Sequence, residues 1–256
     1  MLRLLREGPA PRGASSIITL THAGETIAVS LRRAPTARRF TLRVRFAARD
    51  AVLTMPQRAS LREARAFAER HAAWIAARLN RLPQTIPFAS GSIVPLRGVD
   101  HMLVHRPETR GTVWIETSDD ARDAATLSIC VAGRAEHLHR RVQDHFKHEA
   151  RRDLEGAVAR HARALDLPPR GVGLRDPVSR WGSCSASGSL NFSWRLIMAP
   201  PFVLNYLAAH EVAHLVHLDH SPRFWNLTRR LCADTDRAES WLSAHGAHLH
   251  KYGAKS

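Results

Sequence analysis

The feature that most constrains this chain is the run His210-Glu211-Val212-Ala213-His214. Each residue of an α-helix turns by about 100°, so two histidines four residues apart lie on one face, about 40° apart. Their side chains can bind one metal ion, while the glutamate between them stays free to act on water. The apolar flanks, without Gly or Pro over residues 202–219, predict a buried helix. This arrangement is typical of zinc hydrolases.

A third metal ligand has two candidates. His217 lies on the same helical face as His210, but about 10.5 Å further along the axis. Because Zn–N bonds are about 2.0–2.1 Å long, a straight helix cannot bring both rings to one ion. His220 can reach the ion if the helix ends first. Asp219 tolerates a left-handed backbone, and Ser221-Pro222 is typical of the start of a new helix. We therefore expect the metal ligands His210, His214 and His220.

The composition fits a globular chain in a reducing compartment. Its 256 residues, 44% of them hydrophobic, suffice for one large domain or two small ones. Three scattered cysteines, without a C-x-x-C pair, indicate no disulfide framework. The first residues carry charge too early for a secretory signal, and no run approaches the roughly 18 apolar residues of a membrane span. We expect a cytoplasmic location and no membrane partner, and the oligomeric state stays open.

The net charge of +15 raises the question of nucleic-acid binding. Only three of the 38 basic residues are lysine, so the arginine bias can reflect a GC-rich genome. The arginines are spread along the whole chain, and aromatic residues make up only 6%, too few for an obvious base-stacking surface. Nucleic acid is therefore a possible but disfavoured partner.

The expected fold class is α+β. Residues 1–15 are expected to form a flexible tail. Residues 16–135 form a β-rich part with one helix at about 60–82, which begins at a Ser60/Glu63 capping box. A long helix follows over residues 136–165, and a strand over residues 189–196 precedes the helix with the metal motif. Residues 136–256 form the expected metal-binding catalytic part.

The segment 176–185 is not an ordinary loop, because it combines Arg, Trp, Gly, Ser and Cys. A hairpin follows it, and an edge strand beside the metal could align an extended substrate by main-chain hydrogen bonds. An arginine fork near a hydrolytic metal also suits an anionic group. The structural alternatives are core packing for Trp181 and an ion pair for Arg180. The candidate substrate-binding residues are Arg180, Trp181, Ser183 and Arg195.

Several motifs together resemble the YgjP-like metal-dependent hydrolases, relatives of the SprT- and WLM-type zincin metallopeptidases. These motifs are Arg180-Trp-Gly-Ser-Cys-Ser185, Leu190-Asn-Phe-Ser-Trp-Arg-Leu196, Ala199-Pro200, the histidine run that ends at His220-Ser221, and Phe224-Trp225. The resemblance covers roughly residues 25–250, including Arg32, Arg33, Arg38 and Arg39. It implies a zincin-like core behind an N-terminal β-rich part, the same three histidine ligands, and Glu211 as the catalytic residue. The ligand spacing also matches metzincins, but those have Gly where this chain has His217.

The predicted chemistry is hydrolysis with Zn²⁺, or another divalent ion, as cofactor. The metal would acidify a water molecule, and Glu211 would accept its proton as general base. The favoured function is a metallopeptidase acting on a peptide or protein. One alternative is a metal-dependent nucleoside triphosphate pyrophosphohydrolase, suggested by the basic chain and by arginines near the site. The second is a non-catalytic zinc-containing binding module, which needs a fourth protein ligand such as Cys184.

Overall fold

The structure is a computed structural model that describes residues 16–45, 50–82, 84–118, 126–177 and 179–253. The expected tail at residues 1–15 lies outside these ranges. The chain divides into two compact units, Met1–Leu82 and Pro83–Ser256. Helices and three mixed sheets confirm the α+β class and its β-rich N-terminal region. None of the helices in the described ranges combines the length and apolarity needed to span a membrane.

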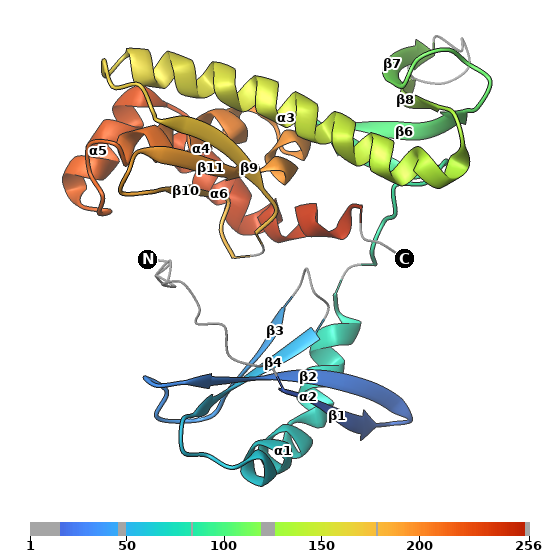
Figure 1. Ribbon diagram of the computed structural model, residues 1–256, viewed down its shortest axis with the longest axis vertical. Coiled ribbons are helices and arrows are strands. Elements are labelled where there is room, and N and C mark those ends of the chain that lie inside the picture. The colour runs from blue at the N-terminus through green and yellow to red at the C-terminus, as the bar shows by residue number, and fades with distance from the viewer. Residues whose placement is uncertain (1–15, 46–49, 83, 119–125, 178, 254–256) are drawn as a thin grey trace. The chain divides into compact units, whose positions relative to one another are not determined.

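The first unit is a four-stranded sheet with two helices on one face (Figure 1). Its strands have the order β1-β2-β4-β3, and their bounds are β1 (Ser16–His22), β2 (Glu25–Ala34), β3 (Thr41–Arg45) and β4 (Asp50–Pro56). Alternate side chains of β1, β2 and β4 point inward and pack on α1 (Leu61–Arg70) and α2 (Ala72–Asn80). The predicted capping box is present, but the single helix expected here is broken at His71 (φ −107°, ψ 10°).

The second unit begins with a sheet that repeats the arrangement of the first. Its strands β5 (Ile93–Leu96), β6 (Val99–Arg106), β7 (Val113–Ser118) and β8 (Thr126–Ala132) have the order β5-β6-β8-β7. In both sheets the second strand runs parallel to the fourth and the other neighbours are antiparallel. Both begin with a two-residue hairpin turn at positive φ, Ala23-Gly24 (50° and 82°) and Arg97-Gly98 (53° and 77°).

The boundary between the compact units lies within the β-rich region. Residues 16–135 contain two four-stranded sheets, and the first unit ends at Leu82, between these sheets. The reason is packing: the inward side chains of β5, β6 and β8 share one core with the long helix α3 (Leu138–Arg163). In Figure 1, α3 extends from the β5–β8 sheet to the helices at the other end of the second unit.

The rest of the second unit forms the scaffold of the candidate site. A three-stranded sheet has the order β10-β11-β9, with β9 (Gly171–Arg175), β10 (Gly182–Cys184) and β11 (Ser189–Ser193). The 3-10 helix η2 (Trp194–Met198) then leads into α4 (Pro201–Ala213). The chain continues through α5 (Pro222–Leu231), α6 (Thr235–His245) and the 3-10 helix η3 (Gly246–Lys251).

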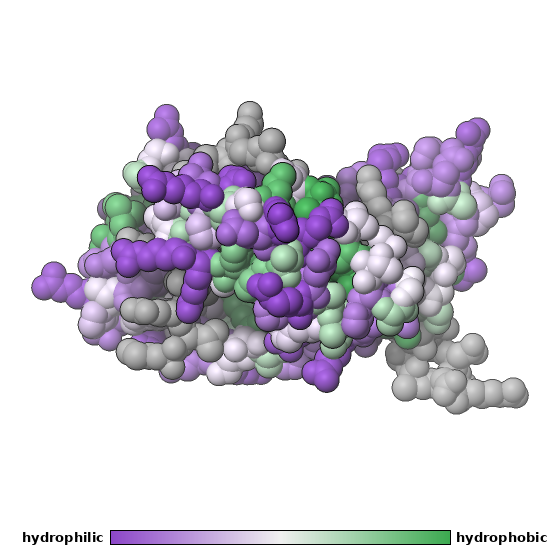
Figure 2. Space-filling view, turned by 90° about the horizontal axis from the view of Figure 1, so that it is seen from below, coloured by the Kyte–Doolittle hydropathy of each residue, from purple (hydrophilic) through white to green (hydrophobic). Residues whose placement is uncertain are grey.

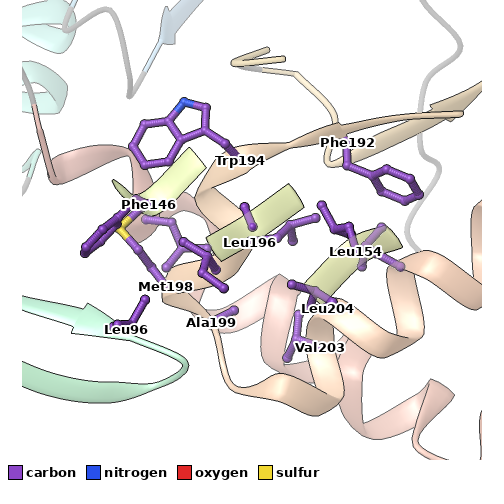
Figure 3. Close-up of a cluster of buried hydrophobic side chains, with 14 of the residues drawn as sticks. Leu96, Phe146, Leu154, Phe192, Trp194, Leu196, Met198, Ala199, Val203 and Leu204 are labelled. Atoms are coloured by element: carbon purple, nitrogen blue, oxygen red, sulfur yellow. The ribbon is translucent and has the colours of Figure 1, made fainter. Parts of the chain in front are cut away.

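The core of the second unit joins α3, η2 and α4. Figure 3 shows Phe146 and Leu154 of α3 around Leu196 and Met198 of η2, with Val203 and Leu204 of α4. The strand expected over residues 189–196 therefore ends at Ser193, where the Ser193 hydroxyl accepts a hydrogen bond from the Arg195 N–H (3.4 Å). All five residues of η2 are buried, so the alternation of apolar residues did not distinguish a strand from a fully buried 3-10 turn.

The β5–β6 turn connects the segment before α4 to α3 through hydrogen bonds. The Arg97 and Gly98 N–H groups donate to the carbonyls of Ile197 (2.7 Å) and Met198 (3.2 Å). The Arg97 guanidinium binds Asp153 on α3 with two hydrogen bonds (2.7 and 2.9 Å) and Glu149 with one (2.7 Å). One hairpin turn thus holds the segment from which the metal-motif helix starts.

We expect Gly98→Ala to destabilise the second unit more than Gly91→Ala does. Both glycines have positive φ (77° and 84°), where a Cβ costs about 1–2 kcal/mol. A Cβ at Gly98 would also lie 3.0 Å from Cα of Pro200, whereas one at Gly91 meets nothing within 4 Å. Overpacking adds about 1–3 kcal/mol. Urea unfolding followed by tryptophan fluorescence measures the difference, and equal losses in the two variants would show that the close approach to Pro200 does not matter.

Candidate active site

The metal-motif helix ends earlier than its sequence pattern suggests. α4 stops at Ala213, and His214 is its C-cap, so His217 and His220 both lie in the turn that follows. Ser221 caps α5 as predicted: its hydroxyl accepts a hydrogen bond from the Phe224 N–H (3.5 Å). Asp219 does not adopt the left-handed backbone that its residue type tolerates. The Asp219 carboxylate instead accepts a hydrogen bond from the Ser221 N–H (3.3 Å), which closes the turn without positive φ.

The turn brings His220 to the two histidines of α4. One ring nitrogen from each of His210, His214 and His220 lies within 4.8 Å of the other two. Nε2 of His210 and Nε2 of His220 are 3.3 Å apart. Two nitrogens bound to one tetrahedral Zn²⁺ at about 2.0–2.1 Å are separated by about 3.3–3.4 Å, so the donor set fits such an ion.

The Nδ1 atoms of His210 and His214 have hydrogen-bond partners, so the Nε2 atom of each ring remains available to a metal ion. The His214 Nδ1–H group donates to the His217 carbonyl (2.8 Å). The Tyr206 hydroxyl lies 3.3 Å from His210 Nδ1 and donates to Glu239 (3.1 Å), so His210 Nδ1–H donates to the Tyr206 oxygen. Such partners fix the tautomer and orientation of a ligating histidine. The contribution of His217 here is its main-chain carbonyl.

Burial keeps the rings of His210 and His214 neutral. It lowers the pKa of His210 to about 3, with a smaller contribution from the neighbouring His214 and His220. Burial also lowers the pKa of His214, although the hydrogen bond to the His217 carbonyl opposes it. The fully buried Phe224 ring packs on all three imidazoles, with centroid distances of 4.9, 4.4 and 4.8 Å to His210, His214 and His220. Neutral rings in an apolar wall offer lone pairs to a cation.

Glu211 is a buried carboxylate beside this group. The residue is only 3% exposed, and its Oε2 has no hydrogen-bond partner among the described residues. Burial raises the pKa of Glu211 to about 8, and the charge of Arg180 acts in the opposite direction. Strand β10 passes so close that a Cβ at Gly182 would overlap the carboxylate oxygen Oε1. Glycine at position 182 is therefore required by the approach of β10 to Glu211.

Cys184 does not join the histidines. Its thiol donates to the Ser185 carbonyl (3.4 Å), and burial, followed by the charge of Glu211, raises its pKa. Among the described residues, the one group of side chains that could hold a metal ion consists of His210, His214 and His220. The arrangement thus offers three protein ligands and a free carboxylate, which is the ligand count of catalytic zinc sites.

Two of the four candidate substrate-binding residues line a cavity that also includes Gly182, the residue that approaches Glu211. The cavity has a volume of about 400 Å³, and its lining includes Arg180 and Ser183 together with Arg175 and Asn191. Sequence reasoning missed Arg175 and Asn191. Strand β11 pairs Asn191 with Ser183 of β10 and Ser193 with Arg175 of β9. Arg180 is exposed and its guanidinium is available to a ligand.

The other two candidates have structural contacts. Trp181 stacks on His250 (5.1 Å between centroids) and packs on Gly246. Arg195 is buried; its guanidinium binds the Asp176 carboxylate (2.7 and 3.1 Å) and the carbonyls of Leu249 (3.3 Å) and Tyr252 (2.7 Å). These contacts favour a role in holding the C-terminal segment for both residues.

We expect Tyr206→Phe to weaken zinc binding about 10–100-fold, because it removes the partner of His210 Nδ1. Sequence reasoning missed this tyrosine, although it lies four residues before His210 on the same helical face. Competition with a chromophoric chelator measures the affinity. Tyr252→Phe is the matched control, since Tyr252 is the other of the two tyrosines and contacts Arg195 through its main-chain carbonyl. Equal affinities for both variants would remove Tyr206 from the site.

Comparison with known proteins agrees with this geometry. The family described as YgjP-like, metallopeptidase domain matches residues 38–245, most of the chain and all the residues of the candidate site. No match was found among curated proteins or among solved structures. The chain therefore belongs to the YgjP-like family and carries its metallopeptidase domain, as the sequence motifs indicated.

Proposed function

We propose that this protein is a zinc-dependent metallopeptidase in which His210, His214 and His220 hold the ion and Glu211 is the general base. The observation that carries the proposal is the state of Glu211, whose buried Oε2 lacks a partner beside three clustered imidazoles. A buried carboxylate without a partner is costly to the fold, and such costs concentrate at functional sites.

The residues of the site have separate tasks in the proposed reaction. When bound, zinc supplies a Lewis acid that acidifies a water molecule and polarises the attacked carbonyl. In its ionised form, which a nearby cation favours, Glu211 accepts a proton from the attacking water at Oε2 and returns it to the leaving amine. Tyr206 and the His217 carbonyl keep two of the imidazoles in the orientation that the ion needs. The buried Phe224 ring packs against the three histidines and helps to hold them in place.

The edge strand β10 favours a peptide as substrate. In its sheet, β10 pairs with β11 on one side only, and its Gly182 lies against Glu211. An extended peptide could pair with the free edge and place its scissile bond near the carboxylate. The cavity with Arg175 and Arg180 would then take an acidic side chain or a terminal carboxylate. We retain the cytoplasm as the proposed location, consistent with three free cysteines.

Nucleoside triphosphate hydrolysis is the second candidate, because the same two arginines would also bind phosphate. The zinc-loaded protein should be tested on casein, on peptides with and without acidic residues, and on nucleoside triphosphates, with Glu211→Gln as the blank. We expect casein and peptide cleavage without triphosphate hydrolysis. Triphosphate hydrolysis that disappears in the blank, with intact casein, would replace the peptidase with a pyrophosphohydrolase.

Arg180→Lys should lower cleavage of acidic peptides about tenfold, equivalent to about 1.4 kcal/mol, because lysine cannot form a bidentate pair. Cleavage of neutral peptides and the zinc content should change little. Arg140→Lys on α3 is the control, since Arg140 is exposed and paired with Asp144 (3.4 Å). A lower melting temperature of Arg180→Lys with unchanged activity per folded molecule would make Arg180 a structural residue.

A further inference from the structure

The positive charge is concentrated in the first unit. Residues 1–82 contain 16 arginines and five acidic residues, whereas residues 83–256 contain 22 basic and 18 acidic residues. A GC-rich genome exchanges lysine for arginine but does not change the balance of positive and negative residues. Although arginines occur along the whole chain, the net positive charge is concentrated in residues 1–82, and this excess needs a physical reason.

Five arginines of this unit gather at one end of its sheet. Arg32 and Arg33 end β2, which runs parallel to β4, so Arg32 pairs with Thr54. Thr41, which opens β3 after Arg38 and Arg39, pairs with the same Thr54 from the other side. Arg58 follows β4 in the loop to α1. The sheet topology thus forms a basic end, defined by Arg32, Arg33, Arg38, Arg39 and Arg58.

The acidic residues of the unit do not neutralise the basic end. Glu25 and Asp50 lie at the opposite end of the strands, where Asp50 binds Arg45 (2.7 Å). Glu63 accepts a hydrogen bond from the Ser60 N–H (2.7 Å), and Glu69 lies 3.9 Å from Arg65. Within the described ranges, no carboxylate forms an ion pair with the five arginines, all of which are exposed.

The basic end is also held rigid. One guanidinium nitrogen of Arg33 donates to the carbonyls of Gln57 (2.8 Å) and Ala59 (2.7 Å), which fastens the end of β2 to the loop that carries Arg58. The Ala37 N–H donates to the Ala34 carbonyl (3.0 Å) and closes the turn before Arg38 and Arg39. The five arginines therefore lie on an ordered backbone, and ligand binding does not have to order it.

We propose that the basic end binds the phosphate backbone of double-stranded nucleic acid. Guanidinium forks match phosphate, and a row of them without neighbouring carboxylates supplies sequence-independent, salt-sensitive affinity.

A single strand would need exposed aromatic platforms, but Phe40 beside the basic end stacks on Phe67 (5.2 Å). A membrane surface would need apolar anchors, and Leu61 is the one large apolar side chain exposed between residues 32 and 62 of the described chain. On the face of the molecule shown in Figure 2, hydrophilic residues are prominent and the hydrophobic residues form small groups.

The test is binding of the full chain to fluorescent DNA and RNA duplexes of the same sequence over a range of salt concentrations. Five phosphate contacts give a slope of about −4 to −5 in log K against log salt. The double variant Arg38→Gln, Arg39→Gln should lose about 10–100-fold in affinity near 0.1 M salt and flatten the slope by about 2. The matched control Arg140→Gln, Arg151→Gln removes the same net charge from exposed positions on α3 and should stay within about twofold of the wild type.

Circular dichroism should show that both variants are folded, since all four side chains are exposed. Equal losses in the two double variants would attribute binding to net charge and overturn the proposal. Absence of duplex binding by the wild type near 0.1 M salt would overturn it as well. Binding to anionic phospholipid vesicles without binding to either duplex would replace nucleic acid with a membrane surface.

Discussion

The zinc-loaded Glu211→Gln variant is expected to lose peptide hydrolysis about 10²–10⁴-fold and to keep its zinc. The amide has the shape of the carboxylate, so the side chain still fits beside Gly182, but it cannot accept a proton from water. Because Glu211 is 3% exposed and its Oε2 has no partner in the described chain, the neutral amide should leave the melting temperature unchanged or raise it.

Initial rates on a quenched fluorescent peptide, together with elemental analysis of the same sample, measure both parts of this expectation. Glu155→Gln on α3 is the matched control: Glu155 is exposed and paired with Arg151 (3.2 Å), so the variant should keep zinc and rate. A Glu211→Gln protein that hydrolyses peptide at the wild-type rate would refute the role of this carboxylate.

His220→Ala is expected to lose zinc binding, whereas His217→Ala keeps it. His220 contributes an imidazole to the cluster. Its removal should therefore weaken zinc binding by more than the roughly 10–100-fold that follows when a hydrogen-bond partner of a ligating histidine is lost. His217 contributes only its carbonyl to His214 Nδ1, and alanine retains that carbonyl. The two residues stand three positions apart in one turn, which makes each the control for the other.

Equilibrium dialysis against buffered zinc, followed by elemental analysis, gives the affinity of both variants. Thermal unfolding of the metal-free proteins should be similar, since both positions lie in the turn between α4 and α5. Full zinc in His220→Ala with loss in His217→Ala would exchange the third ligand and require a different path for the chain after Ala213.

Local sequence signals predicted local structure well. The capping box of Ser60 and Glu63, and the N-cap of Ser221 before Pro222, both depend on hydrogen bonds within three residues, and the structure has them. The helix expected over residues 136–165 is observed as α3, within two residues at each end. The convergence of the three histidines was also predictable, because helical spacing fixed two rings and the Ser221-Pro222 start placed the turn.

Features set by distant packing were not predictable. The duplicated sheet topology, and with it the division at Leu82, depends on strand pairings across the chain that no local pattern encodes. Arg195 looked like a substrate ligand beside a metal motif, but its partners Asp176, Leu249 and Tyr252 are 19 to 57 residues away. Glu239 likewise reaches Tyr206 from α6, 33 residues later. α4 ends at Ala213 because main-chain hydrogen bonds form a turn directly after it. The apolar residues through Val216 had suggested that the helix continues.

X-ray absorption at the zinc edge of the loaded protein tests the central claim most directly, since it counts the atoms that bind the ion. We predict three imidazole nitrogens at about 2.0–2.1 Å and one further oxygen from water, with a spectrum unchanged in Glu211→Gln. A sulfur at about 2.3 Å would place Cys184 in the coordination sphere, and loss of an oxygen in Glu211→Gln would make Glu211 a ligand. Either result would contradict a three-histidine site with a free catalytic carboxylate.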